Sequence, residues 1–110
     1  MKLVLLASVT AIMMVSSALG QTVTVVNGHP TDRIVRIEAI DDSSGELLEA
    51  SLDVVLEPGD EDDVYVVGTG EDCECTLFAT FADGTTIQAR GVDVCADPIW
   101  TILDGDYQID

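Results

Sequence analysis

The segment from Cys73 to Cys95 constrains the fold of this chain more than any other stretch. Two runs of alternating residues flank an Ala-Asp-Gly turn at 82–84, which is the pattern of a β-hairpin. Period-two alternation puts every second residue from Cys73 to Phe81 on the core side of the first run. The sequence therefore predicts two paired strands with a cysteine at each end.

The chain has three cysteines, which permit one disulfide and leave one thiol over. A Cys73–Cys95 bond would span about 22 residues and remove unfolded-state entropy worth about 3 kcal/mol. Cys75 shares the core face, so a Cys75–Cys95 bond is the competing pairing. We favour Cys73 with Cys95 and interpret Cys75 as an odd thiol, buried and inert, because no basic neighbour would stabilise its thiolate. An intermolecular disulfide or a redox site is the alternative role, and the spacing does not fit a zinc site.

Residues 1–20 have the composition of a secretory signal peptide. Lys2 is followed by an apolar run at 3–15 and then by small residues. The run of about 13 residues is shorter than the ~20 that a membrane-spanning helix needs, and no cysteine follows for a lipid anchor. We expect cleavage before Gln21 and a secreted bacterial protein, periplasmic or extracellular, with no membrane insertion after cleavage.

The predicted mature chain is strongly acidic. Removal of 20 of the 110 residues leaves one predicted domain of 90 at 21–110, with 21 acidic side chains against three arginines, a formal net charge of −18. This charge would repel phosphate backbones and anionic headgroups, which argues against nucleic-acid binding and peripheral membrane binding. Cations and basic partners are compatible with it. Dispersed acids would also keep the protein soluble in salty surroundings, where salt screens their repulsion.

Outside the hairpin, β-branched or alternating runs predict strands at 22–26, 32–40, 64–67 and 98–103. Within the second of these runs, period two puts Val35, Ile37 and Ala39 on the core face.

The connections carry turn signals or lack a clear pattern. At 57–60, Pro58 presets φ and Gly59 is able to take a positive φ, which predicts a compact turn. The segment 47–56 is expected to be an irregular connection that ends in a short strand at 53–56. The acidic tail 104–110 is expected to fray.

Six or seven short strands in a chain of this length predict an all-β fold. We expect a small antiparallel β-sandwich, immunoglobulin-like or related, with one disulfide.

Three short motifs punctuate residues 23–96. Leu56-Glu-Pro-Gly59 is an L-x-P-G turn, Cys73 through Phe81-Ala-Asp-Gly84 is a C…F-x-D-G hairpin, and Arg90-Gly-Val-Asp-Val-Cys95 closes as R-G-V-D-x-C. Together with 34–37, they resemble a group of small secreted bacterial β-sandwich proteins of uncharacterised function. The resemblance implies a fold and a hairpin cysteine at the position of Cys73, and it implies no catalytic residue.

Two acidic clusters, at 60–63 and 71–74, flank the predicted strand 64–67. Calcium accepts about six to eight oxygen ligands, so neighbouring turns could gather such a site. The weak calcium candidates are Asp60, Asp62, Asp63, Asp72 and Glu74. A solvated acidic rim is the preferred interpretation, with no metal or other cofactor.

His29 is the only histidine, in a loop with Gly28 and Pro30. A Ser-His-Asp arrangement with Ser43 or Ser44 has no supporting pattern, and no phosphate-binding glycine loop is present. We therefore predict a protein that is not an enzyme, with a small hydrolase as a distant alternative.

The sequence favours a non-enzymatic acidic module that binds a protein or cell-envelope partner, through a sheet edge or through the loops at one end. The alternative is a structural subunit that self-assembles, in which Thr22–Val26 pairs with the sheet edge of another copy.

Overall fold

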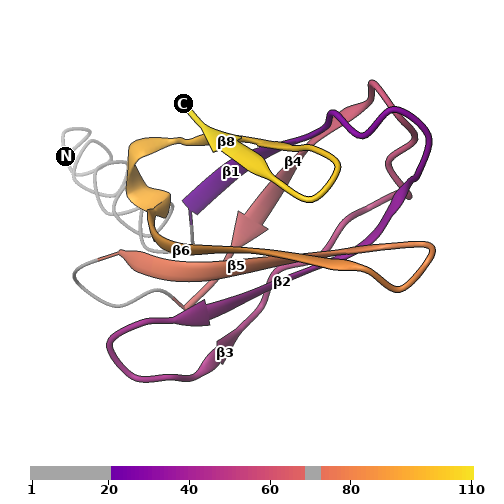
Figure 1. Ribbon diagram of the computed structural model, residues 1–110. Coiled ribbons are helices and arrows are strands. Elements are labelled where there is room, and N and C mark those ends of the chain that lie inside the picture. Colours follow the sequence, from indigo (N-terminus) through magenta and orange to yellow (C-terminus); the bar gives the residue numbers. More distant parts are fainter. Residues whose placement is uncertain (1–20, 69–72) are drawn as a thin grey trace, which may run out of the picture.

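The computed structural model describes residues 21–68 and 73–110, and the predicted signal peptide lies outside these ranges. Within them, eight strands form two four-stranded sheets that pack face to face (Figure 1). One sheet has the strand order β4-β1-β7-β8 and the other has β3-β2-β5-β6. The predicted all-β sandwich is confirmed, with eight strands where six or seven were expected, and the short strands β3 and β8 were not predicted.

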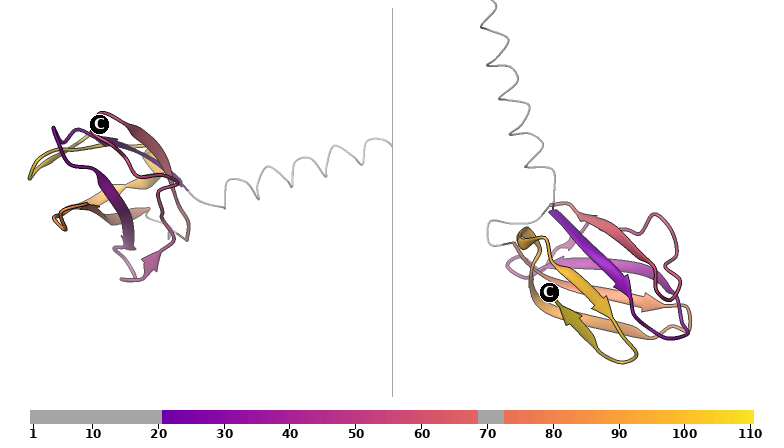
Figure 2. Two further views of the ribbon diagram at one scale, coloured as in Figure 1. Left: turned by 90° about the vertical axis from the view of Figure 1, so that its right-hand side faces the viewer. Right: turned by 90° about the horizontal axis from the view of Figure 1, so that it is seen from above.

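The strands are β1 Gln21–Asn27, β2 Ile34–Asp41, β3 Leu47–Leu48, β4 Glu61–Val66, β5 Glu74–Phe81, β6 Thr86–Asp93, β7 Ile99–Ile102 and β8 Tyr107–Ile109, and a 3₁₀ turn, η1 Val94–Ala96, precedes β7. Paired neighbours are antiparallel except for β1 and β7, which run parallel. Figure 2 shows β1 running between β4 and β7, so both of its edges are paired.

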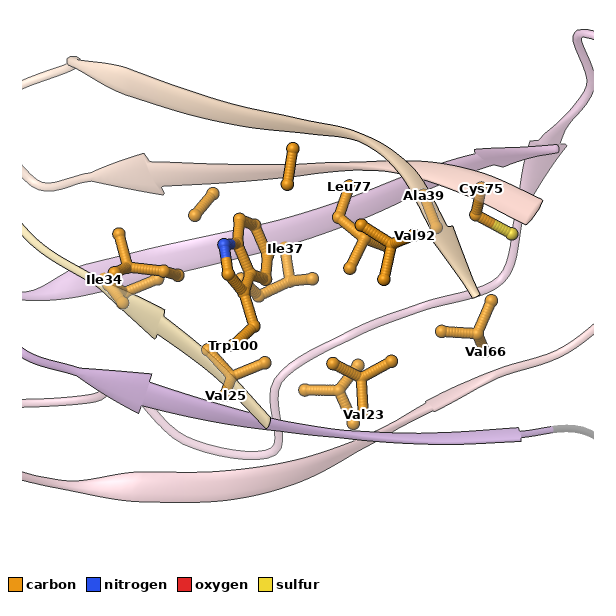
Figure 3. Packing of buried hydrophobic residues seen from close by; sticks show 14 of the residues in the cluster. Val23, Val25, Ile34, Ile37, Ala39, Val66, Cys75, Leu77, Val92 and Trp100 are labelled. Carbon is orange, nitrogen blue, oxygen red and sulfur yellow. The ribbon is translucent and has the colours of Figure 1, made fainter. Parts of the chain in front are cut away.

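Alternate residues of both sheets point inward and form one core. Trp100 of β7 is fully buried and lies between the sheets beside Val25, Ile34 and Ile37 (Figure 3). Its indole Nε1 has no hydrogen-bond partner among the described groups. Trp100 therefore fills the middle of the sandwich while its one polar atom is desolvated.

The expected faces hold in β5, and in β2 they hold for Ile37 and Ala39 but not for Val35. Every second residue of β5 from Cys75 to Phe81 is buried, as predicted. In β2, the prediction that Val35 faces the core is wrong, because Ile34 is buried and Val35 is exposed. A register shift between Ile34 and Arg36 is the cause, since an extra residue in a strand reverses the alternation.

The C-terminal residues are paired, which corrects the expectation of a frayed tail. β8 pairs with β7, and the backbones of Ile99 and Asp110 exchange two hydrogen bonds of 3.0 and 3.1 Å. The described segment 53–56 forms no regular strand, and Leu56 alone bridges to Ile34. The turn at 57–60 is confirmed, with Gly59 at φ 89° and Asp60 N donating to Glu57 O at 2.9 Å.

Candidate functional site

A disulfide joins Cys73 to Cys95 across a Cα separation of 5.7 Å, which confirms the favoured pairing. Cys73 directly precedes β5 and Cys95 lies in η1, so the bond closes the open end of the β5–β6 hairpin. Cys75 is fully buried on the core face of β5 (Figure 3). The bond thus occupies a structural position at the end of the sandwich.

The acidic calcium candidates are not brought together. Asp60, Asp62 and Asp63 lie at or before the start of β4, whereas Glu74 starts β5, beyond the far end of β4. A strand of six residues is about 20 Å long, so the two groups flank opposite ends of the sandwich. Asp72 lies outside the described residues.

Two of these carboxylates bind neighbouring protein groups. The Thr24 hydroxyl donates to Asp63 at 3.0 Å, and Asp53 N donates to Asp62 at 3.4 Å. Over 21–68 and 73–110, the close group of three potential metal ligands is Cys73, Asp93 and Cys95, and its two sulfurs are bonded to each other. These residues give no geometric support to a cation site.

The loops at one end of the sandwich are organised by Asn27, which is fully buried. Its Nδ2 donates to Asp32 O at 2.9 Å and to Leu56 O at 2.8 Å. Its Oδ1 accepts from His29 N at 3.0 Å. Asn27 thereby ties the β1–β2 loop to the connection that precedes β4, and these bonds satisfy the polar atoms of its own buried amide.

His29 is held in place by the same loop. Its Nδ1 accepts hydrogen bonds from Thr31 N at 3.1 Å and Asp32 N at 2.9 Å. Its ring packs on Phe81 with centroids 4.9 Å apart, and Nε2 lies 3.5 Å from the Asp104 carboxylate. The imidazole therefore supports the loop end through both of its nitrogens.

Asp83 stands near this histidine. Its pKa is lowered from the ordinary value, chiefly by the hydrogen bond from the Thr85 hydroxyl and next by that from Thr85 N. The Thr85 hydroxyl is therefore committed to Asp83 as a donor, which stabilises the turn of the hairpin.

Ser43 and Ser44 lie at the opposite end of the sandwich from His29, separated by the length of β2. Their hydroxyls donate to the buried Asp41, at 3.0 and 3.1 Å. The pKa of Asp41 is lowered from its ordinary value, chiefly by the hydrogen bond from Ser43 N. Burial acts in the opposite direction, and the two hydroxyls lower the pKa further.

We expect ionised Asp41 to stabilise the fold at neutral pH. Because its folded pKa lies below the unfolded value of about 3.9, the contribution is present above that pH and is lost as the pH falls through the folded pKa. Urea unfolding should show that the stability difference between wild type and Asp41→Asn shrinks from pH 7 to pH 2. Glu46→Gln, in the same loop, controls for the loss of one charge. An equal Asp41→Asn difference at both pH values would contradict this assignment.

A hollow of the described surface lies along β2, and we name it the β2–β3 groove. Residues 35–38 of β2 form one wall and residues 47–52 form the other, around about 490 Å³. Its apolar part comes from Leu48, Ala50 and Leu52, which pack against the core, and its polar part includes Glu38 and Glu49. Arg36 lies there too, with Nε 3.6 Å from the Glu38 carboxylate.

The groove exists because the chain after β3 leaves β2 and follows β4. Glu49 exchanges backbone hydrogen bonds with Val67 at 2.9 and 3.3 Å, and Asp53 N reaches Asp62 at the start of β4. The chain returns to β2 at Leu56, which exchanges two 3.0 Å bonds with Ile34. The part of β2 between Ile34 and Ala39 is therefore left beside a hollow.

Exposed apolar side chains occur in this groove and in the chain that follows it. Val35 is 41 % exposed and Leu47 is 66 % exposed, and both line the groove. Val54 and Val55, which come shortly after the lining residue Leu52 in the chain, are exposed as well. These four make up half of the large exposed hydrophobic residues in the described part of the chain. Exposed apolar residues with polar neighbours are typical of binding surfaces, which makes the groove a candidate. Sequence reasoning missed it because Val35 reads as a core residue and 47–56 has no clear pattern.

The other sheet edges are less available for binding. Residues 49–53 lie alongside β4 at its edge, and β8, at the other edge of the same sheet, is only three residues long. β6 has a register shift in its pairing with β5, where Gly91 takes φ 65° and Arg90 is exposed. Bulges and charges of this kind discourage pairing along an edge. The β2–β3 groove is therefore our candidate functional site.

Fold and site together define a class, a small acidic β-sandwich with one disulfide and an apolar groove at a sheet edge. Comparisons with known protein families, with curated proteins and with solved structures find no match to this chain. The described ranges contain no helix with the length and apolarity that a membrane crossing requires. The resemblance to secreted bacterial proteins stays a prediction.

Proposed function

We propose that this protein is a non-enzymatic secreted module that binds a protein partner through the β2–β3 groove. The observation that supports this most directly is the exposure of Val35 and Leu47 beside an apolar hollow. Burial of apolar surface in a complex is favourable by about 25 cal/mol per Å². A partner that covers these side chains would gain affinity from groups that the isolated protein leaves in water.

Secretion is supported by the disulfide and by the N-terminal sequence. Disulfides persist mainly in oxidising compartments such as the periplasm and the extracellular space. The Cys73–Cys95 bond fits such a location, and so does the apolar run at 3–15.

Site-specific photo-crosslinking tests the proposed function. A photoreactive amino acid replaces Leu47 in one variant and Ile99 in the other, because both positions are exposed and apolar but lie in different sheets. Irradiation of the producing cells should give a discrete crosslinked protein from position 47 and none from position 99. The absence of a discrete product from position 47, or equal products from both positions, would contradict the proposal.

The self-assembly hypothesis gains no support from the strand on which it was based. β1 already pairs with β4 and β7, so Thr22–Val26 would have to leave both neighbours to pair with another copy. A crosslink between two copies at position 47 would replace our proposal with self-association through the groove.

A further inference from the structure

The groove lies beside the edge of β2 and not over one face of its sheet. Four consecutive residues of β2, 35–38, line the hollow. A hollow on one face of a sheet meets only alternate residues of a strand, because successive side chains point to opposite faces. The hollow therefore lies beside the edge of β2, where Val35 and Arg36 are exposed and Ile37 has a buried side chain.

The register of the sheet indicates which backbone groups face the groove. Asp41 N donates to Glu46 O at 2.9 Å, and Ala39 is paired with Leu48 on the same side of β2. Alternate residues of a strand bond toward the same side, so the N–H and C=O of Ile37 point that way. Among the described residues, no strand pairs with 35–38 on this side.

The length of the unpaired part of β2 limits how many residues of another chain can bind beside it. β3 occupies the positions beside Ala39 and Ile40, and Leu56 occupies the position beside Ile34. The four residues between them span about 13 Å at about 3.3 Å per residue. Three or four extended residues of another chain would fit, with alternate side chains facing Leu48 and Leu52.

The charge of the protein indicates which residue types would lie on either side of the bound segment. The predicted mature chain carries a formal charge of −18, and the groove itself contains Glu38 and Glu49 with Arg36 as its only cation. An acidic partner would be repelled during approach, whereas lysine or arginine beside the bound residues would be attracted.

We infer that the groove binds a short extended segment of a partner protein, with apolar side chains over Leu48 and Leu52 and basic residues at its ends. The segment adds to the edge of β2 by hydrogen bonds with Ile37, in the manner of an added strand. This inference rests on the proposed function and names the chemistry of the partner.

Peptides with a valine-isoleucine-valine centre test the inference. One peptide has two lysines at each end, a second has glutamates in the same places, and a third keeps the lysines but replaces the central isoleucine with proline. NMR titration of ¹⁵N-labelled protein with the lysine peptide should shift amide signals at 35–38 and 47–52 and slow the exchange of the Ile37 amide. We expect the glutamate and proline peptides to bind at least about tenfold more weakly, and the affinity of the lysine peptide to fall with added salt.

The variants Leu47→Ser and Ile99→Ser locate the binding without a change of charge. Leu47→Ser should weaken the lysine peptide about tenfold through loss of apolar contact, and Ile99→Ser should leave its affinity unchanged. Equal affinity for all three peptides, shifts confined to residues away from the groove, or no binding at millimolar concentration would each overturn the inference. If crosslinking from position 47 then still captured a partner protein, the proposed function would stand and only the partner chemistry would be wrong.

Discussion

Replacement of Trp100 by alanine is expected to remove about 3–5 kcal/mol from the free energy of unfolding. The side chain is fully buried between the two sheets, where it contacts both, so its loss leaves a cavity that neighbours from two layers cannot close together (Figure 3). Single domains are stable by only about 5–15 kcal/mol, and small ones lie at the lower end. The variant should therefore be largely unfolded near physiological temperature.

Trp100→Phe separates the effect of volume from that of the indole N–H. Phenylalanine fills less space but removes the donor that has no partner among the described groups, and such a buried unpaired donor costs about 1–3 kcal/mol. The two effects oppose each other, so we expect the free energy of unfolding to fall by about 1 kcal/mol or less. Urea unfolding followed by far-UV circular dichroism is the measurement, because Trp100 is the only tryptophan and its fluorescence is lost in both variants. A phenylalanine variant as unstable as the alanine variant would show that Nε1 is hydrogen-bonded in solution.

Loss of the disulfide should cost about 3 kcal/mol, which is the second large effect. The bond spans a sequence separation of 22 residues and fixes η1 against the start of β5, where Val94 N also donates to Cys73 O at 3.1 Å. Unfolding in urea with and without reductant measures the effect. The double variant Cys73→Ser/Cys95→Ser should match the reduced wild type and should not respond to reductant.

Cys75→Ala provides the matched control. It removes a buried sulfur from the core face of β5 but leaves the disulfide in place, so its stability should still depend on reductant. If Cys75→Ala abolished the response to reductant, Cys75 would be the residue that pairs with Cys95. Peptide mapping without reduction would then identify the bond directly.

Local patterns in the sequence predicted the elements whose structure depends on near neighbours. β5 alternates correctly because it lies between β2 and β6 with one face on the core and the other face outward. The turn at 57–60 follows from the backbone preferences of Pro58 and Gly59 alone. The sequence also favoured the Cys73–Cys95 pairing over Cys75–Cys95, and the structure has this bond. Cys73 lies just outside β5, where its φ of 59° is in the left-handed region.

The errors concern residues whose partners are distant in the chain. Val35 turned outward because a bulge in β2 accompanies the pairing of Ile34 with Leu56, and no pattern near residue 35 encodes that contact. Residues 107–109 became a strand because β7 offered an unpaired edge to a segment that looks like a polar tail.

The sequence by itself determined an acidic, disulfide-bonded β-sandwich, since alternation, turn residues and charge are properties of short segments. The β2–β3 groove was decided only by the tertiary structure. It arises where the chain at 49–53 pairs along β4 instead of β2, and this choice between two sheet edges depends on contacts that form after the sheets assemble. Candidate core residues could therefore be found from the alternation of apolar and polar residues. The candidate binding site lies where that alternation is interrupted, at Val35 and in the segment 47–56, so it could be found only from the structure.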